Sequence, residues 1–148
     1  MQFPKKIYLS DDDLDDVEFF QLAVADVCGK CSLIVSNNGE ELLSQLGNCG
    51  DNMPDIIFLD VNMPKVNGLE ALKRIKDIQQ FHSVPVIVYS TTSNDVFVND
   101  AHKLGANFYF VKPSDLSLLR SKIQLLLNFD WTSLTFPTDF SQFVLKAG

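Results

Sequence analysis

The chain has 148 residues, 46% of them hydrophobic, which is enough apolar surface for one compact domain and too little sequence for two of ordinary size. Twelve Lys and Arg against nineteen Asp and Glu give a net charge of −7, which repels a nucleic acid backbone and favours a cation or a basic protein surface as partner. No apolar stretch approaches the ~20 residues needed to cross a bilayer, and the N-terminus has no apolar signal core. We expect a cytoplasmic protein without membrane insertion or direct DNA binding.

Five short apolar stretches recur along the chain, separated by polar residues. They span residues 7–10, 32–36, 55–60, 84–90 and 107–111. Several are apolar at consecutive positions, as from Ile56 to Leu59, which is typical of strands covered on both faces of a parallel sheet. We therefore predict five parallel strands.

Segments with the periodicity of amphipathic helices follow each of these stretches. The first places Leu14 on its apolar stripe and Asp16 on its solvent side, and it begins at a cap formed by Asp12 or Asp13. The other four begin at Asn38-Gly39, Asn67-Gly68, Asn94 and after Pro113, the last with Ser114 or Asp115 as cap. The alternation of strand and helix predicts a doubly wound α/β fold with helices on both faces of the sheet.

The last twenty residues, 129–148, are rich in aromatic side chains. Four of the twelve phenylalanines and the single tryptophan, Trp131, fall in this stretch, whereas a solvated linker has few aromatic residues. We expect residues 1–128 to form the domain and residues 129–148 to form a tail that packs on it or forms a patch for a partner. We expect no output domain.

Polar residues gather where the predicted strands end. Asp11 to Asp13 follow the first strand, Asp60 ends the third, Ser90 and Thr92 end the fourth, and Lys112 follows the fifth. In an open α/β sheet, ligands bind beyond the carboxyl ends of the strands, at the point where the strand order reverses. We therefore expect these side chains to converge at one edge of the sheet.

Carboxylates that lie close together repel one another unless some are protonated or a cation binds between them. The predicted loops offer several oxygens and no His or Cys, which favours Mg²⁺, with Mn²⁺ as an alternative, and points to phosphoryl chemistry with an Asp as nucleophile. Each residue alone has a plainer interpretation, as a helix cap or a surface charge. Their joint occurrence at four strand ends favours the site.

The ordered set of motifs resembles the receiver domain of two-component response regulators. The resemblance runs from residue 7 to about residue 128. It rests on residues 7–13 with the pair Asp11-Asp12, on 55–64 with Asp60, on Gly68, on 85–91 with Ser90, and on 105–113 with Lys112-Pro113. Any one segment is weak evidence, whereas the ordered set is specific. The resemblance implies a flavodoxin-like (βα)₅ fold with a five-stranded parallel sheet of order 2-1-3-4-5.

The resemblance assigns the acidic residues to phosphoryl transfer and metal binding. Asp60 matches the phosphoacceptor and is also expected to bind the metal ion, and Asp12 matches the direct Mg²⁺ ligand. Asp11 matches the acid that holds the ion, commonly through water, and Asn62 is expected to contribute its backbone carbonyl. This alignment requires the first strand to end directly before Asp11, because Asp13 adds a third consecutive acid and a shift by one residue would move both roles.

The same resemblance implies a switch. Lys112 matches the lysine that pairs with the phosphoryl group, Ser90 the switch hydroxyl, and Tyr109 the aromatic switch position. Asp60 would attack a phosphohistidine in line while Mg²⁺ and Lys112 neutralise the phosphoryl oxygens. Ser90 would then move inward and Tyr109 rotate into the freed space, so that the surface of the fourth helix, fifth strand and fifth helix changes.

The partners that the resemblance implies are proteins. The donor would be a sensor histidine kinase or a histidine phosphotransfer protein, and the output a downstream protein target reached by contact or by onward phosphate transfer. Asn62 and Thr92 flank the path of an attacking water and are expected to influence the lifetime of the acyl phosphate. Homodimerisation is left open.

Two other functions fit part of the sequence. The acidic run that starts at Asp11 resembles the Asp-x-Asp motif of haloacid-dehalogenase-type phosphatases, which would make Asp11 the nucleophile but leaves the segment around Asp60 unexplained. A protein-binding module that keeps an acidic pocket without being phosphorylated is the second alternative.

The three cysteines are too few for a disulfide framework, so we expect free thiols in a reducing compartment. Cys28 and Cys31 have the CxxC spacing of some zinc and redox sites. Zinc usually needs four ligands, and Cys49, His82 and His102 are scattered elsewhere. We interpret the pair as incidental thiols in a loop.

Overall fold

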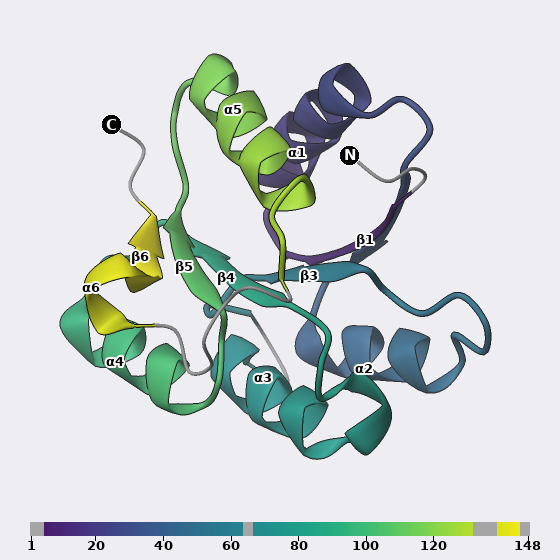
Figure 1. Ribbon diagram of the computed structural model, residues 1–148, viewed down its shortest axis with the longest axis vertical. Coiled ribbons are helices and arrows are strands. Elements are labelled where there is room, and N and C mark those ends of the chain that lie inside the picture. The colour runs from purple at the N-terminus through teal and green to yellow at the C-terminus, as the bar shows by residue number, and fades with distance from the viewer. Residues whose placement is uncertain (1–4, 64–66, 132–138, 146–148) are drawn as a thin grey trace.

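The computed structural model describes residues 5–63, 67–131 and 139–145 (Figure 1). Strands and helices alternate along most of the chain. In order they are β1 (Lys6–Ser10), α1 (Leu14–Val27), β2 (Ser32–Ser36), α2 (Gly39–Gly47), β3 (Ile56–Leu59), α3 (Gly68–Asp77), the 3₁₀ helix η1 (Gln79–Phe81), β4 (Val86–Ser90), α4 (Asp95–Lys103), β5 (Phe108–Val111), α5 (Leu116–Leu127), α6 (Phe140–Phe143) and β6 (Val144–Leu145). Within the described ranges, no helix is long and apolar enough to span a membrane.

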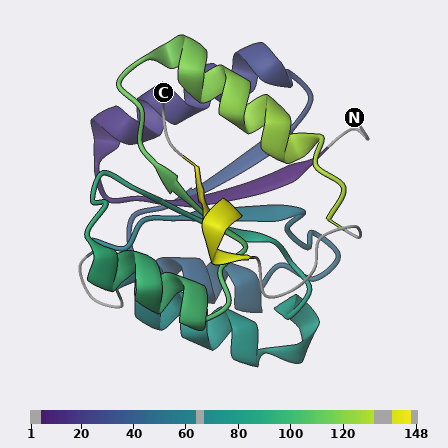
Figure 2. The ribbon, with the colours of Figure 1, turned by 60° about the vertical axis from the view of Figure 1, so that its left-hand side comes forward.

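The centre of the molecule is a parallel sheet with the strand order β2-β1-β3-β4-β5-β6. Helices α1 and α5 cover one face, and α2, α3 and α4 cover the other, as Figures 1 and 2 show. All residues of β3 and β4 are buried, as their consecutive apolar residues predict. The predicted flavodoxin-like α/β fold is confirmed, with one strand more than the five expected.

Short polar side chains fix where the helices begin. The acceptor side chains at their N-caps are Asp13 for α1, Asn38 for α2, Asn67 for α3, Asn94 for α4 and Asp115 for α5. The prediction for Leu14 was wrong, because its side chain is 70% exposed. As the first residue of α1 it precedes the stretch that packs on the sheet, which starts at Val17.

The expectation of free thiols at Cys28 and Cys31 was also wrong, because a disulfide bond joins them. Cys28 caps the end of α1, and the chain turns there toward β2. The turn brings the two Cα atoms to 5.4 Å, a distance that a disulfide bridges without backbone movement. Cys49 is a free, buried cysteine.

The aromatic residues beyond α5 lie against the domain wherever the structure describes them. Trp131 packs on Phe108 at the start of β5, with 5.8 Å between ring centroids. Phe143 of α6 is fully buried, and β6 extends the sheet by pairing with Tyr109 and Phe110 of β5. Figure 2 shows α6 and β6 beside β5 at the edge of the sheet. Phe136 lies outside the described residues.

Candidate functional site

Three aspartates meet where β1 and β3 end. Ser10 and Leu59 are paired residues of these strands, and the Asp60 amide donates a hydrogen bond to the Ser10 carbonyl at 3.0 Å. Asp11 and Asp60 each follow the last residue of their strand, so this register places them together. One carboxylate oxygen from each of Asp11, Asp12 and Asp60 lies within 4.8 Å of the other two. Asp11 and Asp60 are buried, whereas Asp12 is exposed.

Lys112 adds a positive charge from the end of β5. Its Nζ lies 2.7 Å from Oδ2 of Asp11, 2.8 Å from Oδ2 of Asp16 and 3.1 Å from Oδ2 of Asp60. The same nitrogen stands 5.3 Å from the centre of the Tyr89 ring. Burial acts to lower the pKa of Lys112, but its hydrogen bonds to carboxylates and their negative charges outweigh burial and raise the pKa above its usual value. The side chain is therefore held in its charged form.

Burial destabilises the ionised form of the Asp11 carboxyl. Burial raises the pKa of Asp11 to about 6, and the charge of Asp60 adds to the rise. Lys112 opposes this, as does the amide of Asp13, which donates a hydrogen bond to Oδ1 of Asp11 at 3.0 Å. Desolvation remains the larger effect, so a cation bound beside Asp11 would relieve a penalty that Lys112 leaves in part uncompensated.

Asp13 serves as a helix cap rather than as part of the acidic cluster. Its Oδ1 accepts hydrogen bonds from the amides of Asp15 and Asp16 at 3.0 and 3.2 Å. Strand β1 ends at Ser10, directly before Asp11, which is the register that the assignment of Asp11 and Asp12 requires. The first two acids of the run therefore belong to the cluster with Asp60, and the third caps α1.

Asp16 is the residue that sequence reasoning missed. The helical pattern placed it on the solvent side of α1, but its carboxylate contacts Lys112 and is 33% exposed. It stands in the first turn of α1, and no spacing in the sequence relates it to Lys112, which is 96 residues away. The prediction failed because helical periodicity indicates only which side of α1 packs on the sheet, whereas Lys112 lies beyond the ends of the strands.

The loop after β3 is shaped around Asp60. The Asn62 amide donates a hydrogen bond to Oδ1 of Asp60 at 3.2 Å. The Gly68 amide donates a hydrogen bond to the Val61 carbonyl at 3.1 Å, which holds the start of α3 against this loop. A Cβ atom at Gly68 would overlap the carbonyl oxygen of Asp60 and lie 2.6 Å from the Val61 Cα. Glycine is required there because the backbone of α3 touches the backbone that carries Asp60.

Ser90, Thr92 and Tyr109 are linked beside this pocket. Ser90 ends β4, is buried, and accepts a hydrogen bond from the Thr92 amide at 3.3 Å. The Tyr109 hydroxyl donates to the Thr92 carbonyl at 2.7 Å. Tyr109 is fully buried, its pKa is raised by burial, and its ring faces that of Phe143 with 6.3 Å between centroids.

The charges of the pocket favour a divalent cation. The carboxylates of Asp11, Asp16 and Asp60 contact the ammonium group of Lys112, and that of Asp12 lies beside those of Asp11 and Asp60, so that among these described residues negative charges outnumber positive ones. The described ligand atoms of the cluster are all oxygens, which hard ions such as Mg²⁺ and Mn²⁺ prefer. A bound divalent ion and a phosphoryl group would each neutralise part of the charge that the other brings.

Comparison with known protein families identifies the kind of protein to which this acidic cluster belongs. The family described as "Response regulator receiver domain" matches residues 8–124, most of the chain. The chain belongs to this family. Receiver domains bind divalent metal ions, are phosphorylated by kinases, typically on an aspartate, and relay the signal to targets.

This receiver domain is similar to complete proteins of comparable length. It is 29% identical to the response regulator Rcp1 of Synechocystis over 138 residues, 90% of this chain and 94% of Rcp1. A structure described as the Mn²⁺-bound form of Rcp1 matches with a TM-score of 0.74, and it is covered completely by 91% of this chain. The phosphorylated cyanobacterial phytochrome response regulator RcpA matches with a TM-score of 0.79 and 30% identity, again over its whole length and 92% of this chain.

Other relatives share a shorter stretch. A protein-glutamate methylesterase/protein-glutamine glutaminase of Trichodesmium erythraeum is 41% identical over 75 residues, 49% of this chain and 21% of that enzyme. The chain therefore spans about a fifth of the methylesterase. This similarity concerns part of the receiver domain, and the activity in that relative's name is said of the relative.

Proposed function

We propose that this receiver domain accepts a phosphoryl group on Asp60 from the phosphohistidine of a sensor kinase or of a histidine phosphotransfer protein. The observation that carries the proposal is the setting of the Asp60 carboxylate. One of its oxygens accepts from the Asn62 amide and the other from Lys112, and two further carboxylates stand within 4.8 Å. This is an anchored nucleophile beside a cation site, which phosphoryl transfer needs.

In the proposed reaction, a carboxylate oxygen of Asp60 forms a bond to phosphorus while the bond from phosphorus to the histidine nitrogen breaks. The histidine ring keeps the electron pair of the broken bond. Asp11, Asp12, Asp60 and the backbone carbonyl of Asn62 would hold a divalent ion, which supplies positive charge to the phosphoryl oxygens. Lys112 would pair with another of those oxygens. The Mn²⁺ in the Rcp1 structure supports a divalent ion here, and we propose Mg²⁺ for this chain.

The signal would leave through the surface of α4, β5 and α5. Tyr109 is buried in this structure, and it would rotate into the space that an inward movement of Ser90 frees. We propose that the phosphoryl group attracts the Ser90 hydroxyl. Because the Thr92 amide donates a hydrogen bond to that hydroxyl and the Thr92 carbonyl accepts one from Tyr109, the loop at Thr92 would move with Ser90. Because Phe143 packs on Tyr109, residues 139–145 would register this movement. Thr92 and Asn62 are proposed to influence the lifetime of the phosphoryl group.

The proposal extends to the tail and to the partners. Residues 1–128 would form the receiver domain and residues 129–148 a tail that rests on it, which the burial of Phe143 and the packing of Trp131 support. A downstream protein target would contact the α4-β5-α5 surface. Removal of residues 129–148 should weaken target binding or self-association and leave phosphorylation intact, and unchanged binding and oligomeric state would contradict it.

One experiment separates this proposal from its rivals. The protein is incubated with a small phosphodonor and Mg²⁺, and the intact mass of the wild type is compared with those of Asp60→Asn and Asp11→Asn. We expect a phosphoryl adduct that Asp60→Asn abolishes. An adduct that persists in Asp60→Asn and is lost in Asp11→Asn would indicate phosphatase chemistry on Asp11. No adduct on any form would favour the binding module.

A further inference from the structure

Asp16 is closer to Lys112 than the proposed phosphoacceptor is. Its Oδ2 lies 2.8 Å from Nζ, against 3.1 Å for Oδ2 of Asp60. Asp16 is itself held in place by α1. It stands in the first turn of the helix, and its amide donates a hydrogen bond to Oδ1 of the N-cap Asp13 at 3.2 Å. The contact joins residues 96 positions apart, so it ties the start of α1 to the end of β5.

Three carboxylates crowd the ammonium group of Lys112: those of Asp16 and Asp60 accept hydrogen bonds from it, and that of Asp11 forms an ion pair with it. An ammonium group has three N–H donors, and Asp11, Asp16 and Asp60 each place an oxygen within 3.1 Å of the nitrogen. A phosphoryl group on Asp60 needs one of these donors. Lys112 must therefore leave or weaken one existing contact when the phosphoryl group arrives.

The burial of the three acids decides which contact is given up. The Asp11 side chain has no exposed surface, and a buried carboxylate without its cation is strongly destabilised. The Asp60 side chain is 8% exposed and becomes the phosphorylated group itself. The Asp16 side chain is 33% exposed, so water can replace the ammonium group as its partner. Asp16 is the partner that Lys112 can release at the lowest cost.

We propose that Asp16 is a positioning residue that holds Lys112 before phosphorylation and competes with the phosphoryl group for it. This inference rests on the proposed phosphorylation of Asp60. Asp16 also adds a negative charge to the cation site, and it lies no more than about 6 Å from Asp60, because both contact the same nitrogen. The same carboxylate therefore strengthens metal binding and slows the approach of an anionic phosphodonor.

Removing the charge of Asp16 should move these two properties in opposite directions. In Asp16→Asn the amide keeps an acceptor for Lys112 and the side chain keeps its size. We expect metal affinity to fall, and we expect the phosphorylation rate at saturating metal to rise by about three- to tenfold. That range corresponds to two unit charges about 6 Å apart with an effective dielectric constant between 80 and 40. Damage to the fold of the pocket would instead lower both.

The experiment compares wild type, Asp16→Asn, Asp16→Glu and Asp15→Asn. Asp15 is the matched control, because it is an exposed acid in the same helical turn and loses the same charge. The affinity for Mn²⁺ is measured by calorimetry, and the rate of phosphorylation by acetyl phosphate is followed by intact mass at saturating Mg²⁺. We expect opposite changes in Asp16→Asn, smaller changes in Asp15→Asn, and values close to the wild type in Asp16→Glu, which keeps the charge.

The outcomes distinguish this inference from the function on which it rests. A fall in both properties of Asp16→Asn, or changes equal to those of Asp15→Asn, would overturn the role of Asp16 while leaving phosphorylation of Asp60 in place. A wild type that takes up no phosphoryl group would overturn the proposed function and this inference with it.

Discussion

Replacing Phe143 by Ala tests whether residues 139–145 are an integral part of the domain. The Phe143 side chain is completely buried, and its ring lies 4.9 Å from that of His102 and 6.3 Å from that of Tyr109, measured between centroids. Phe140 stands one helical turn earlier in α6 and is 47% exposed. The pair offers the same chemical change at a buried and at an exposed position.

The expected loss follows from burial and from the place of this segment in the fold. Truncating a fully buried Phe to Ala costs about 3–5 kcal/mol in a protein core. Strand β6 pairs with β5 and lies at the edge of the sheet, so residues 139–145 can detach without unfolding the other strands. The loss of stability in Phe143→Ala cannot exceed the free energy that holds residues 139–145 on the rest of the domain, because a larger loss would only detach the segment. We expect about 2–3 kcal/mol for Phe143→Ala and less than about 1 kcal/mol for Phe140→Ala.

The assay is urea unfolding followed by circular dichroism, with hydrogen exchange at the amides of β6 as a second readout. Exchange in β6 should accelerate in Phe143→Ala and change little in Phe140→Ala. Equal losses in the two variants would refute the argument from burial. A wild-type free energy of unfolding in Phe143→Ala would show that the segment contributes nothing to the domain.

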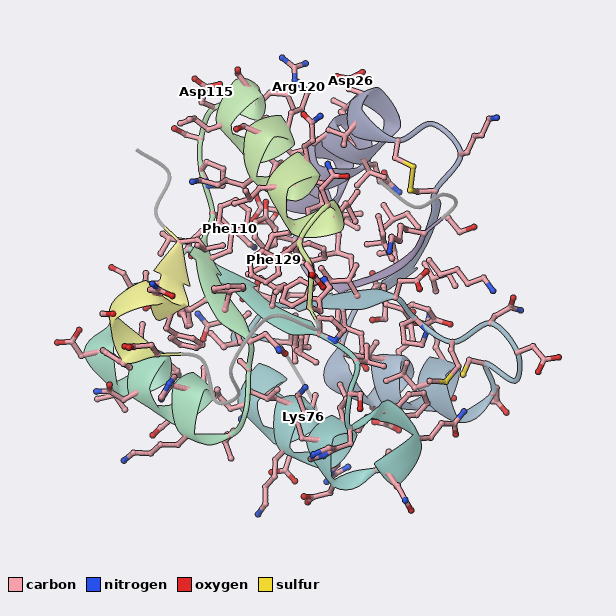
Figure 3. All side chains as sticks on the ribbon, viewed as in Figure 1. Asp26, Lys76, Phe110, Asp115, Arg120 and Phe129 are labelled. Carbon is pink, nitrogen blue, oxygen red and sulfur yellow. A yellow bond between two sulfur atoms is a disulfide. The ribbon has the colours of Figure 1, made fainter. Side chains whose placement is uncertain are left out.

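Three further predictions concern a titrating group, a close backbone contact and the disulfide. Burial lowers the pKa of Lys76, labelled at α3 in Figure 3, from 10.5 to about 8, so the unfolded chain binds more protons between these values. The free energy of unfolding of the wild type relative to Lys76→Met should therefore rise by up to about 2 kcal/mol from pH 7 to pH 9.5 in urea titrations, and a flat difference would refute it. Gly68→Ala should lower the free energy of unfolding by about 1–3 kcal/mol and weaken Mn²⁺ binding in calorimetry, because Asp60 must shift. Gly47→Ala is its control, since nothing lies within 4 Å of a Cβ there, and equal effects in both would contradict the steric reason. Reduction of the bond between Cys28 and Cys31 should cost no more than about 2 kcal/mol, because the loop it closes is short, and the thermal unfolding of a Cys28→Ser/Cys31→Ser double variant should be insensitive to reductant.

The sheet and its helices were predictable because local patterns and burial agree. Consecutive apolar residues in 56–59 and 86–89 mark strands that are covered on both faces, and the structure buries each of them. Asn67 and Asn94 start helices because their side chains accept hydrogen bonds from free amides of the first turn. The polar residues at strand ends converged because parallel strands end at one edge of the sheet.

The features that the sequence did not reveal depend on contacts between distant or very short segments. The contact between Asp16 and Lys112 joins residues 96 positions apart, whereas helical periodicity relates only residues within one helix. Strand β6 has two residues, too few for any periodicity. The disulfide between Cys28 and Cys31 depends on how sharply the chain turns after α1, which residue spacing alone does not determine.

Asp12 offers a test of whether the acidic cluster is built for a cation, because its effect on stability should change sign when metal is added. Asp12 is exposed, and its carboxylate lies within 4.8 Å of those of Asp11 and Asp60, whereas Lys112 contacts the latter two. Without metal, Asp12→Asn removes repulsion, so the melting temperature should equal or exceed that of the wild type. With metal at a hundred times its Kd, the wild type should gain about 2.7 kcal/mol, and Asp12→Asn should gain less, because one ligand has lost its charge. Thermal unfolding in chelator and in excess Mg²⁺ checks both signs, and the exposed Asp15→Asn should show neither. A variant that is destabilised in chelator and keeps the full gain in Mg²⁺ would mean that Asp12 supports the fold and not the ion.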